Sequence, residues 1–308
     1  MSLHVIVGGG PVGSSTASLL ASRGEQVRVI SRDGAGPDHP RVERIAADAA
    51  KPMRLRELTE QATAIYNCAS PDVHRWAAEW PPLMGSLMHA AERSGAVLAS
   101  VGSLYTYGPM DGEITEETPM RPTSVKGSIR ARLWHDALEA HRAGRIRTTE
   151  VRASDYVGPG ANSLLNREVV PKVVAGEPVV LPVDLDAPHS WTYIGDTARV
   201  LVAAASEERA WGRPWLVPTP PPASLRDVAN RVAAFTGAPA PKLASMSRLK
   251  RWFTELFNRQ AREFREVAYQ FQRPFVVDAS ATTKTFGIQP TPLDDALRET
   301  AEATTRTR

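Results

Sequence analysis

The segment from Gly8 to Gly13 reads Gly-Gly-Gly-Pro-Val-Gly and constrains the fold of this chain more than any other. It matches the pattern G-x-G-x-x-G, follows the short apolar run Val5–Val7 and leads into Val12–Ser22, which has helical spacing. A strand, a glycine turn and a helix in this order bind the pyrophosphate of a dinucleotide on the free N–H groups of the helix start. We predict contacts from Gly8, Gly10, Pro11, Val12 and Gly13.

The first half of the chain continues to alternate apolar strands with helical patterns. Further strands are predicted at Val27–Ile30, Ile65–Asn67, Val97–Val101 and Thr148–Arg152. Helices are predicted at Trp76–Ser94, which Gly95 ends, and at Arg130–His141, which Gly144 ends. This alternation predicts an α/β fold with a Rossmann-like, doubly wound parallel sheet covered on both faces.

The second half has a different pattern. Residues Pro218–Pro222 predict a stiff extended segment. Helices are predicted at Leu225–Phe235, with Ser224 as the N-cap, and at Leu249–Gln272. We therefore expect residues 1–160 to form the dinucleotide-binding domain, with 189–217 returning to it. Residues 161–188 and 218–308 would form a smaller C-terminal α/β substrate lobe.

Composition excludes several classes of protein. The chain has 308 residues, 42% of them hydrophobic, and its 37 basic and 34 acidic residues give a net charge of +3. The profile is that of a folded protein, and the interspersed charges predict no nucleic-acid partner. The single cysteine and the scattered histidines predict no disulfide and no metal site. No apolar run approaches the roughly 18 residues of a membrane span, so we expect a cytoplasmic protein.

The end of the second predicted strand bears on the choice of cofactor. An acidic residue here would accept a hydrogen bond from the ribose 2′-hydroxyl of NAD. The sequence instead has Ser31 and Arg32, which suit the 2′-phosphate of NADP. Asp33 lies one residue later, and its carboxylate could accept the hydrogen bond from the 2′-hydroxyl of NAD. The cofactor is therefore predicted to be NADP, with NAD as the alternative.

Four later segments carry a resemblance to a known family. They are Ser100–Gly108, Arg152–Gly160, His189–Ala198, and Pro274–Asp278 with Phe286–Pro290. In this order they resemble the Ser-Ser-x-x-x-Tyr-Gly, Arg-Pro-x-Asn-x-Tyr-Gly-Pro-Gly, His-Val-Asp-Asp-Val-Ala and C-terminal segments of extended short-chain dehydrogenases/reductases, the NAD-dependent epimerase/dehydratase group. The glycine segment also looks like the start of flavin monooxygenases, but these four matches displace that interpretation.

The resemblance implies roles for particular positions. Asp48 would reach the adenine, Ala69 and Ser70 would line the ribose, and Ser103 matches the family's Ser/Thr that binds the substrate oxygen. The nicotinamide would be flanked by residues 153–156, among them Ala153, Ser154 and Asp155. Dimerisation in this family uses paired helices, here Trp76–Ser94 and Arg130–His141. His189, Trp191 and Asn162 would border the substrate cleft.

The family's Tyr-x-x-x-Lys motif is missing. Lys126 stands where the tyrosine is expected and Arg130 where the lysine is expected. Arg130 keeps the charge and donors that bind a ribose. The missing acid has three candidate replacements in the chain, Lys126, Tyr105 and Tyr107. A fourth source is an acidic hydroxyl on the substrate itself.

Three functions follow from these observations. The first is an atypical NAD(P)H-dependent ketoreductase, an oxidoreductase that reduces a carbonyl of a small molecule, with an aromatic secondary metabolite as the candidate substrate. The second is a nucleotide-sugar epimerase or dehydratase with a relocated acid. The third is a non-catalytic NADP-binding sensor. The first is preferred, because standard epimerisation relies on the tyrosine that this chain lacks.

Overall fold

A seven-stranded parallel sheet forms the centre of the computed structural model, which describes residues 2–247, 257 and 259–306. The strand order is β10-β6-β5-β4-β1-β2-β3, and every neighbouring pair is parallel. The strands are β1 (Leu3–Val7), β2 (Gln26–Ser31), β3 (Val42–Ala46), β4 (Ala62–Asn67), β5 (Val97–Ser103), β6 (Arg147–Ala153) and β10 (Pro214–Leu216).

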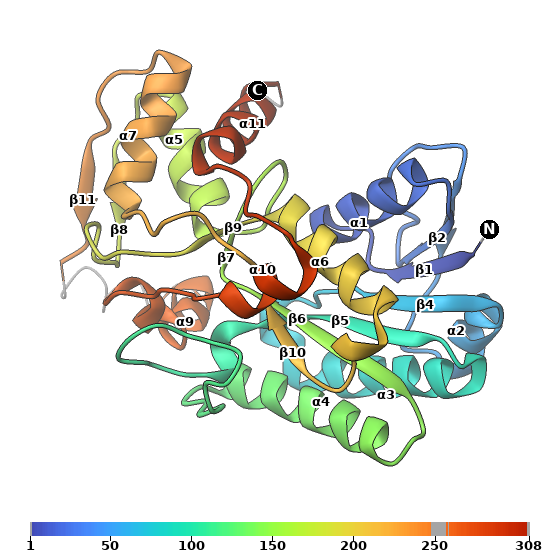
Figure 1. Ribbon diagram of the computed structural model, residues 1–308. Coiled ribbons are helices and arrows are strands. Elements are labelled where there is room, and N and C mark those ends of the chain that lie inside the picture. Colours follow the sequence, from blue (N-terminus) through green and yellow to red (C-terminus); the bar gives the residue numbers. More distant parts are fainter. Residues whose placement is uncertain (1, 248–256, 258, 307–308) are drawn as a thin grey trace.

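Helices cover both faces of this sheet (Figure 1). One face packs against α1 (Pro11–Ser22) and α6 (Ile194–Ser206). The opposite face packs against α2 (Pro52–Thr59), α3 (Trp76–Ser94) and α4 (Val125–Arg142). The central strand β1 reads as a nearly continuous apolar run because both of its faces are buried. The predicted Rossmann-like, doubly wound α/β fold is confirmed.

The direction of winding reverses between β1 and β4, which are neighbours in the sheet. From β1 the chain winds outward to β2 and β3, and it then crosses back to β4 and continues in the other direction. Open α/β sheets bind their ligands beyond the carboxyl ends of the strands at such a reversal point.

A second apolar core lies beyond the carboxyl ends of the strands, to the left in Figure 1. It is built mainly from α5 (Val170–Val174), α7 (Leu225–Thr236) and α11 (Leu293–Arg306), with two small parallel sheets beside them. These sheets pair β7 (Asp155–Val157) with β9 (Trp191–Tyr193), and β8 (Val179–Leu181) with β11 (Leu243–Ser245). Strand β7 begins two residues after β6 ends, so the chain passes directly from the main sheet into this second core.

The structure differs from the sequence-based predictions at four of its elements. Strand β3 and helix α2 were not predicted. Helix α4 was predicted to begin at Arg130 but begins at Val125, because the Ser124 hydroxyl caps it by accepting a hydrogen bond from the Gly127 N–H. The helix expected at Leu249–Gln272 lies partly outside the described residues. Its described part is not continuous: α9 (Arg259–Arg265) ends before a separate 3₁₀ turn, η5 (Ala268–Phe271). The division of the chain into the two expected domains stays a prediction.

The other helix predictions are confirmed. Helix α3 spans the predicted residues and ends at Gly95, which has the left-handed φ of +69°. Helix α7 starts after Ser224, as predicted, in a reciprocal capping box with Asp227. Among the described residues no helix combines the length and the apolarity that a membrane crossing needs.

We expect the capping box of α7 to contribute measurably to stability. The Ser224 hydroxyl accepts from the Asp227 N–H at 3.1 Å, and Ser224→Ala leaves that N–H unpaired. The free energy of unfolding, measured by urea denaturation, should fall by about 1 kcal/mol. Ser22→Ala is the control, since that exposed hydroxyl bonds only within the last turn of α1. An equal effect of both substitutions would contradict the prediction.

Candidate functional site

The glycine turn connects β1 to α1 at the reversal point of the sheet. Gly8 has φ +108°, and a Cβ there would lie 2.7 Å from backbone atoms of Cys68 and Ala69 at the end of β4. A Cβ on Gly13 would lie 1.9 Å from the Gly8 carbonyl oxygen. The close approach of strand and helix therefore requires both glycines, as the sequence pattern predicts.

Gly10 is different, because the protein itself does not need a glycine there. Its φ of −70° suits any residue, and a Cβ on Gly10 would meet nothing within 4 Å. Helix α1 begins directly after it, with Pro11 at N1, no side-chain cap and no acidic residue in its first turn. The N–H groups of Val12 and Gly13 thus belong to an uncapped helix start, which suits an anionic ligand. These features fit a dinucleotide pyrophosphate.

Two glycine variants should separate packing from binding. Gly13→Ala forces the Gly8 carbonyl to move, so we expect a loss of about 1 to 3 kcal/mol in the free energy of unfolding. Gly10→Ala should unfold within about 0.5 kcal/mol of wild type and yet bind dinucleotide at least about tenfold more weakly, because the new methyl stands where the pyrophosphate approaches. Urea denaturation and calorimetry measure the two effects. Undiminished binding by Gly10→Ala would contradict this account of the turn.

The loop after β2 carries a positive and a negative side chain, Arg32 and Asp33, where the adenosine half of a dinucleotide is expected. Arg32 is 66% exposed, and its Nη1 lies 3.8 Å from Oε2 of Glu79 on α3. Ser31 Oγ donates to the Ala35 carbonyl, and the Ala35 N–H donates to Asp33 Oδ1, which holds the pKa of that carboxyl below its usual range. A cation for a 2′-phosphate and carboxylates for a 2′-hydroxyl are therefore both present.

The remaining predicted adenosine residues lie at the ends of β3 and β4. Asp48 follows β3, is exposed, and accepts the Ala50 N–H at 3.0 Å. Ala69 and Ser70 follow β4, and Ala69 is the residue that Gly8 packs against. Glu79 was not predicted to belong to this region. Its spacing in the sequence gives no signal, because only the fold brings the first turn of α3 to the end of β2.

Ser103 is the last residue of β5, at the carboxyl edge of the sheet. Its Oγ accepts the Tyr105 N–H at 3.2 Å and caps the 3₁₀ turn η2 (Leu104–Thr106). Tyr105 lies against Trp76 with ring centroids 6.3 Å apart, and burial raises its pKa. Within the described part of the chain the Tyr105 hydroxyl makes no hydrogen bond, so it is a neutral donor without a protein acceptor.

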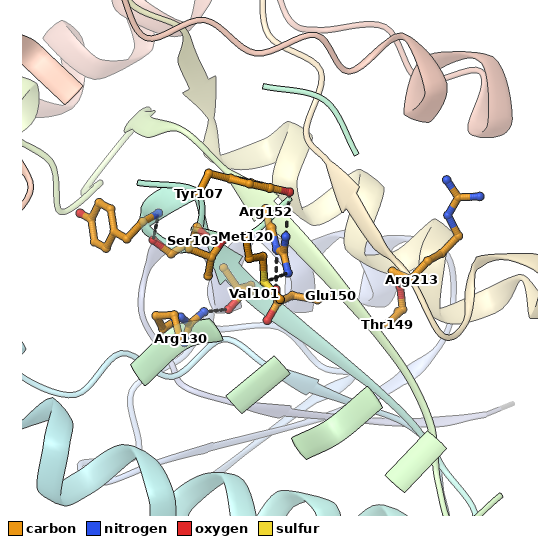
Figure 2. Close-up of polar contacts among 11 residues, drawn as sticks. Val101, Ser103, Tyr107, Met120, Arg130, Thr149, Glu150, Arg152 and Arg213 are labelled. Carbon is orange, nitrogen blue, oxygen red and sulfur yellow. Dashed lines mark hydrogen bonds and ion pairs between the residues drawn. The ribbon is translucent and has the colours of Figure 1, made fainter. Parts of the chain in front are cut away.

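Tyr107 has a different environment, inside the protein (Figure 2). Its hydroxyl accepts a hydrogen bond from Nη1 of Arg152 at 2.7 Å, and Nε of the same guanidinium donates to Glu150 Oε1 at 2.7 Å. Burial raises the pKa of Tyr107. The hydroxyl is thus already bound to a buried ion pair, and its assignment as a replacement acid stays a prediction.

Removing each tyrosine hydroxyl should distinguish these environments. Tyr107→Phe leaves Arg152 short of a partner, so we expect a loss of about 1.5 to 3 kcal/mol in the free energy of unfolding. Tyr105→Phe breaks no hydrogen bond described here and should stay within about 0.5 kcal/mol of wild type. Urea denaturation of both variants measures the difference, and equal stabilities would contradict the prediction.

Arg130 and Lys126 extend from α4 in different directions. The Arg130 guanidinium is buried and donates to the Val101 carbonyl of β5 (Figure 2). It also lies 4.5 Å from the ring centre of Trp80. Lys126 Nζ lies 2.5 Å from Glu263 Oε2 and 3.4 Å from Glu266 Oε1. The ammonium is therefore ion-paired with α9 and the residue that follows it. Its role as a proton donor stays a prediction.

The segment after β6 has hydroxyls that the protein leaves unpaired. Ser154 Oγ and the Tyr156 hydroxyl are buried without a hydrogen-bond partner among the described residues, and so is Ser100 Oγ on β5. Ala153 ends β6, and Asp155 begins β7. Buried polar atoms are rarely left unpaired in proteins. These hydroxyls therefore fit the nicotinamide and ribose end of a dinucleotide.

Comparison with known proteins identifies the family. The model of the NAD-dependent epimerase/dehydratase family matches residues 4–215. The chain belongs to this family. Among solved structures, UDP-glucose 4-epimerase from Thermotoga maritima superposes with a TM-score of 0.82 at 14% identity, over 100% of this chain and 99% of that one. No curated protein matches the sequence.

Two further structures of this fold are similar. The dTDP-glucose 4,6-dehydratase from Bacillus anthracis, in complex with NAD, has a TM-score of 0.80 at 16% identity and covers 99% of this chain and 97% of that one. MoeE5, in complex with UDP-glucuronic acid and NAD, has a TM-score of 0.81 at 20% identity over 100% of both chains. At these identities the likeness establishes the fold. The family resemblance read from the sequence is confirmed.

Proposed function

We propose that the protein is an NAD(P)-dependent oxidoreductase that reduces a carbonyl of a small molecule. The observation that carries this proposal is the open space at Gly10 beside the uncapped start of α1, together with the unpaired buried hydroxyls of β5 and of the segment after β6. A dinucleotide bound there would span the reversal point of the sheet. When bound, the reduced dinucleotide supplies the hydride.

The chain's own groups would bind and orient the reactants. The N–H groups at the start of α1 would hold the pyrophosphate. Arg130, next to Val101 at the carboxyl edge of the sheet, would bind a ribose hydroxyl. Ser103 Oγ would steady the substrate oxygen, since its hydroxyl hydrogen is free to donate while its oxygen accepts the Tyr105 N–H.

A nucleotide-sugar epimerase or dehydratase is the second candidate. It is favoured by the family and by similar structures that hold UDP-glucuronic acid with NAD. It requires an acid–base group to take the place of the missing tyrosine and predicts NAD⁺ that stays bound during purification. Extraction and chromatography of the purified protein test this point. Ketone reduction instead predicts exchangeable NADPH, and an aromatic ketone panel then seeks the substrate.

A non-catalytic sensor is the remaining alternative. It predicts NADPH binding without turnover of any ketone in the panel and unchanged function after Ser103→Ala. Assembly into dimers through α3 and α4 also remains a proposal, which light scattering tests.

Arg32 is proposed to select NADP through its 2′-phosphate. We expect Arg32→Ala to weaken NADPH binding about tenfold in calorimetry, equivalent to about 1.4 kcal/mol, and to leave NADH binding unchanged. Arg75→Ala is a matched control, because Arg75 pairs with the same Glu79 carboxylate at 2.7 Å. Unchanged NADPH and NADH affinities in Arg32→Ala would show that Arg32 does not bind the 2′-phosphate. Failure of wild type to bind NADPH, NADH and NAD⁺ would overturn the proposed function.

A further inference from the structure

A buried histidine and a carboxyl group form a pair behind the proposed site. His189 lies two residues before β9, and its Nε2 is 3.0 Å from Asp155 Oδ2 at the start of β7. Its other ring nitrogen, Nδ1, is 3.1 Å from the carbonyl oxygen of Gln270 in η5. This carbonyl is available because α9 ends and the chain turns through η5.

The two hydrogen bonds of the His189 ring require one proton more on the His189–Asp155 pair than a neutral histidine and a carboxylate would hold. A carbonyl oxygen only accepts, so Nδ1 carries a hydrogen and donates it to Gln270. A neutral imidazole has only that one nitrogen-bound hydrogen. Its Nε2 would then have no hydrogen and would face an oxygen of the Asp155 carboxylate, so that two hydrogen-bond acceptors would be in contact. The 3.0 Å contact therefore needs a second hydrogen, either on Nε2 or on Oδ2.

The surroundings leave one exit for this proton. The His189 ring stacks on Phe271 at 4.6 Å and on Phe275 at 5.6 Å, and it lies 4.7 Å from Trp191. Its side chain is 3% exposed, whereas that of Asp155 is 17% exposed. The imidazole is closed off on its faces and at Nδ1, so the proton reaches solvent or substrate through the Asp155 carboxyl.

The groups around Asp155 come from four elements. Tyr105 of η2, Tyr156 of β7 and Tyr269 of η5 all interact electrostatically with its carboxylate, and Arg130 of α4 interacts with Tyr105 and Tyr156. Burial first, and Asp155 in addition, raise the pKa of these three phenols, that of Tyr269 to about 12. The three tyrosines therefore stay protonated near neutral pH, and Asp155 is the carboxyl group among them.

We propose that Asp155, positioned by His189, is the acid–base group of this site in place of the family's missing tyrosine. The proposal rests on the proposed function. In the reduction the substrate carbon gains a hydride from the reduced dinucleotide, which is thereby oxidised, and the substrate oxygen gains the proton of the pair, which is left as a carboxylate and a neutral imidazole. The C–H bond of the hydride donor, the bond that held the pair's proton and the carbonyl π bond break, a C–H and an O–H bond form on the substrate, and the pair recovers its proton from water. The reverse reaction returns the proton to the pair.

The proton count is tested on the wild-type protein without any ligand. Nuclear magnetic resonance of protein labelled with ¹⁵N in histidine and ¹³C in aspartate reports the state of both partners, and His189→Gln assigns the signals. At pH 7.5 we expect either two N–H groups on His189 or one N–H with a protonated Asp155. His4 is the internal control, because burial lowers its pKa and it should show one N–H. One N–H on His189 beside an ionised Asp155 would overturn the count.

The acid–base role is tested by calorimetry with NAD⁺ and NADH in two buffers of different ionisation enthalpy. The positive ring of NAD⁺ disfavours the extra proton, so wild type should release part of a proton on binding NAD⁺ and none on binding NADH. Asp155→Asn should release no proton per mole of bound dinucleotide with either. Identical proton release by wild type and Asp155→Asn would overturn the role of Asp155. Absence of any dinucleotide binding would overturn the proposed function and this role together, whereas the resonance experiment decides the proton count alone.

Discussion

The contact between β1 and α1 is the interaction on which the rest of the site depends. Gly13 packs against the Gly8 carbonyl, and Gly8 packs against the backbone after β4, with no room for a methyl group at either position. This contact brings the uncapped start of α1 to the reversal point of the sheet. The remaining parts of the proposed site lie at the carboxyl ends of β2, β5 and β6, which the parallel sheet aligns along one edge.

The candidate residues are of two kinds, according to whether their buried polar atoms have partners within the protein. Tyr107 is held by Arg152 and Glu150, and Lys126 by Glu263 and Glu266, so both already have charged partners. The hydroxyls of Ser154 and Tyr156 have no partner among the described residues. A buried polar atom without a partner is costly, so the proposed dinucleotide site is assigned to atoms of this second kind.

Much of the fold could be predicted from local sequence, because helix caps and buried strands have short-range signatures. Gly95 ends α3 and Ser224 caps α7, as predicted. Strand β3 was missed because it lies at the edge of the sheet and three of its five residues are exposed, so that it lacks an apolar run. The helix predicted through Gln272 fails in its described part, because η5 packs its apolar residues around His189 and turns a carbonyl toward that ring.

The sequence by itself determined the glycine turn between β1 and α1, the alternation of strands and helices and the absence of a Tyr-x-x-x-Lys pair, because each depends on residues close together in the chain. Only the tertiary structure decided which side chains meet. It joined Asp155 to His189, Lys126 to α9, and Arg32 to Glu79. The physical reason is that these partners lie 34, more than 130 and 47 residues apart, and only the packing of sheet and helices brings them together.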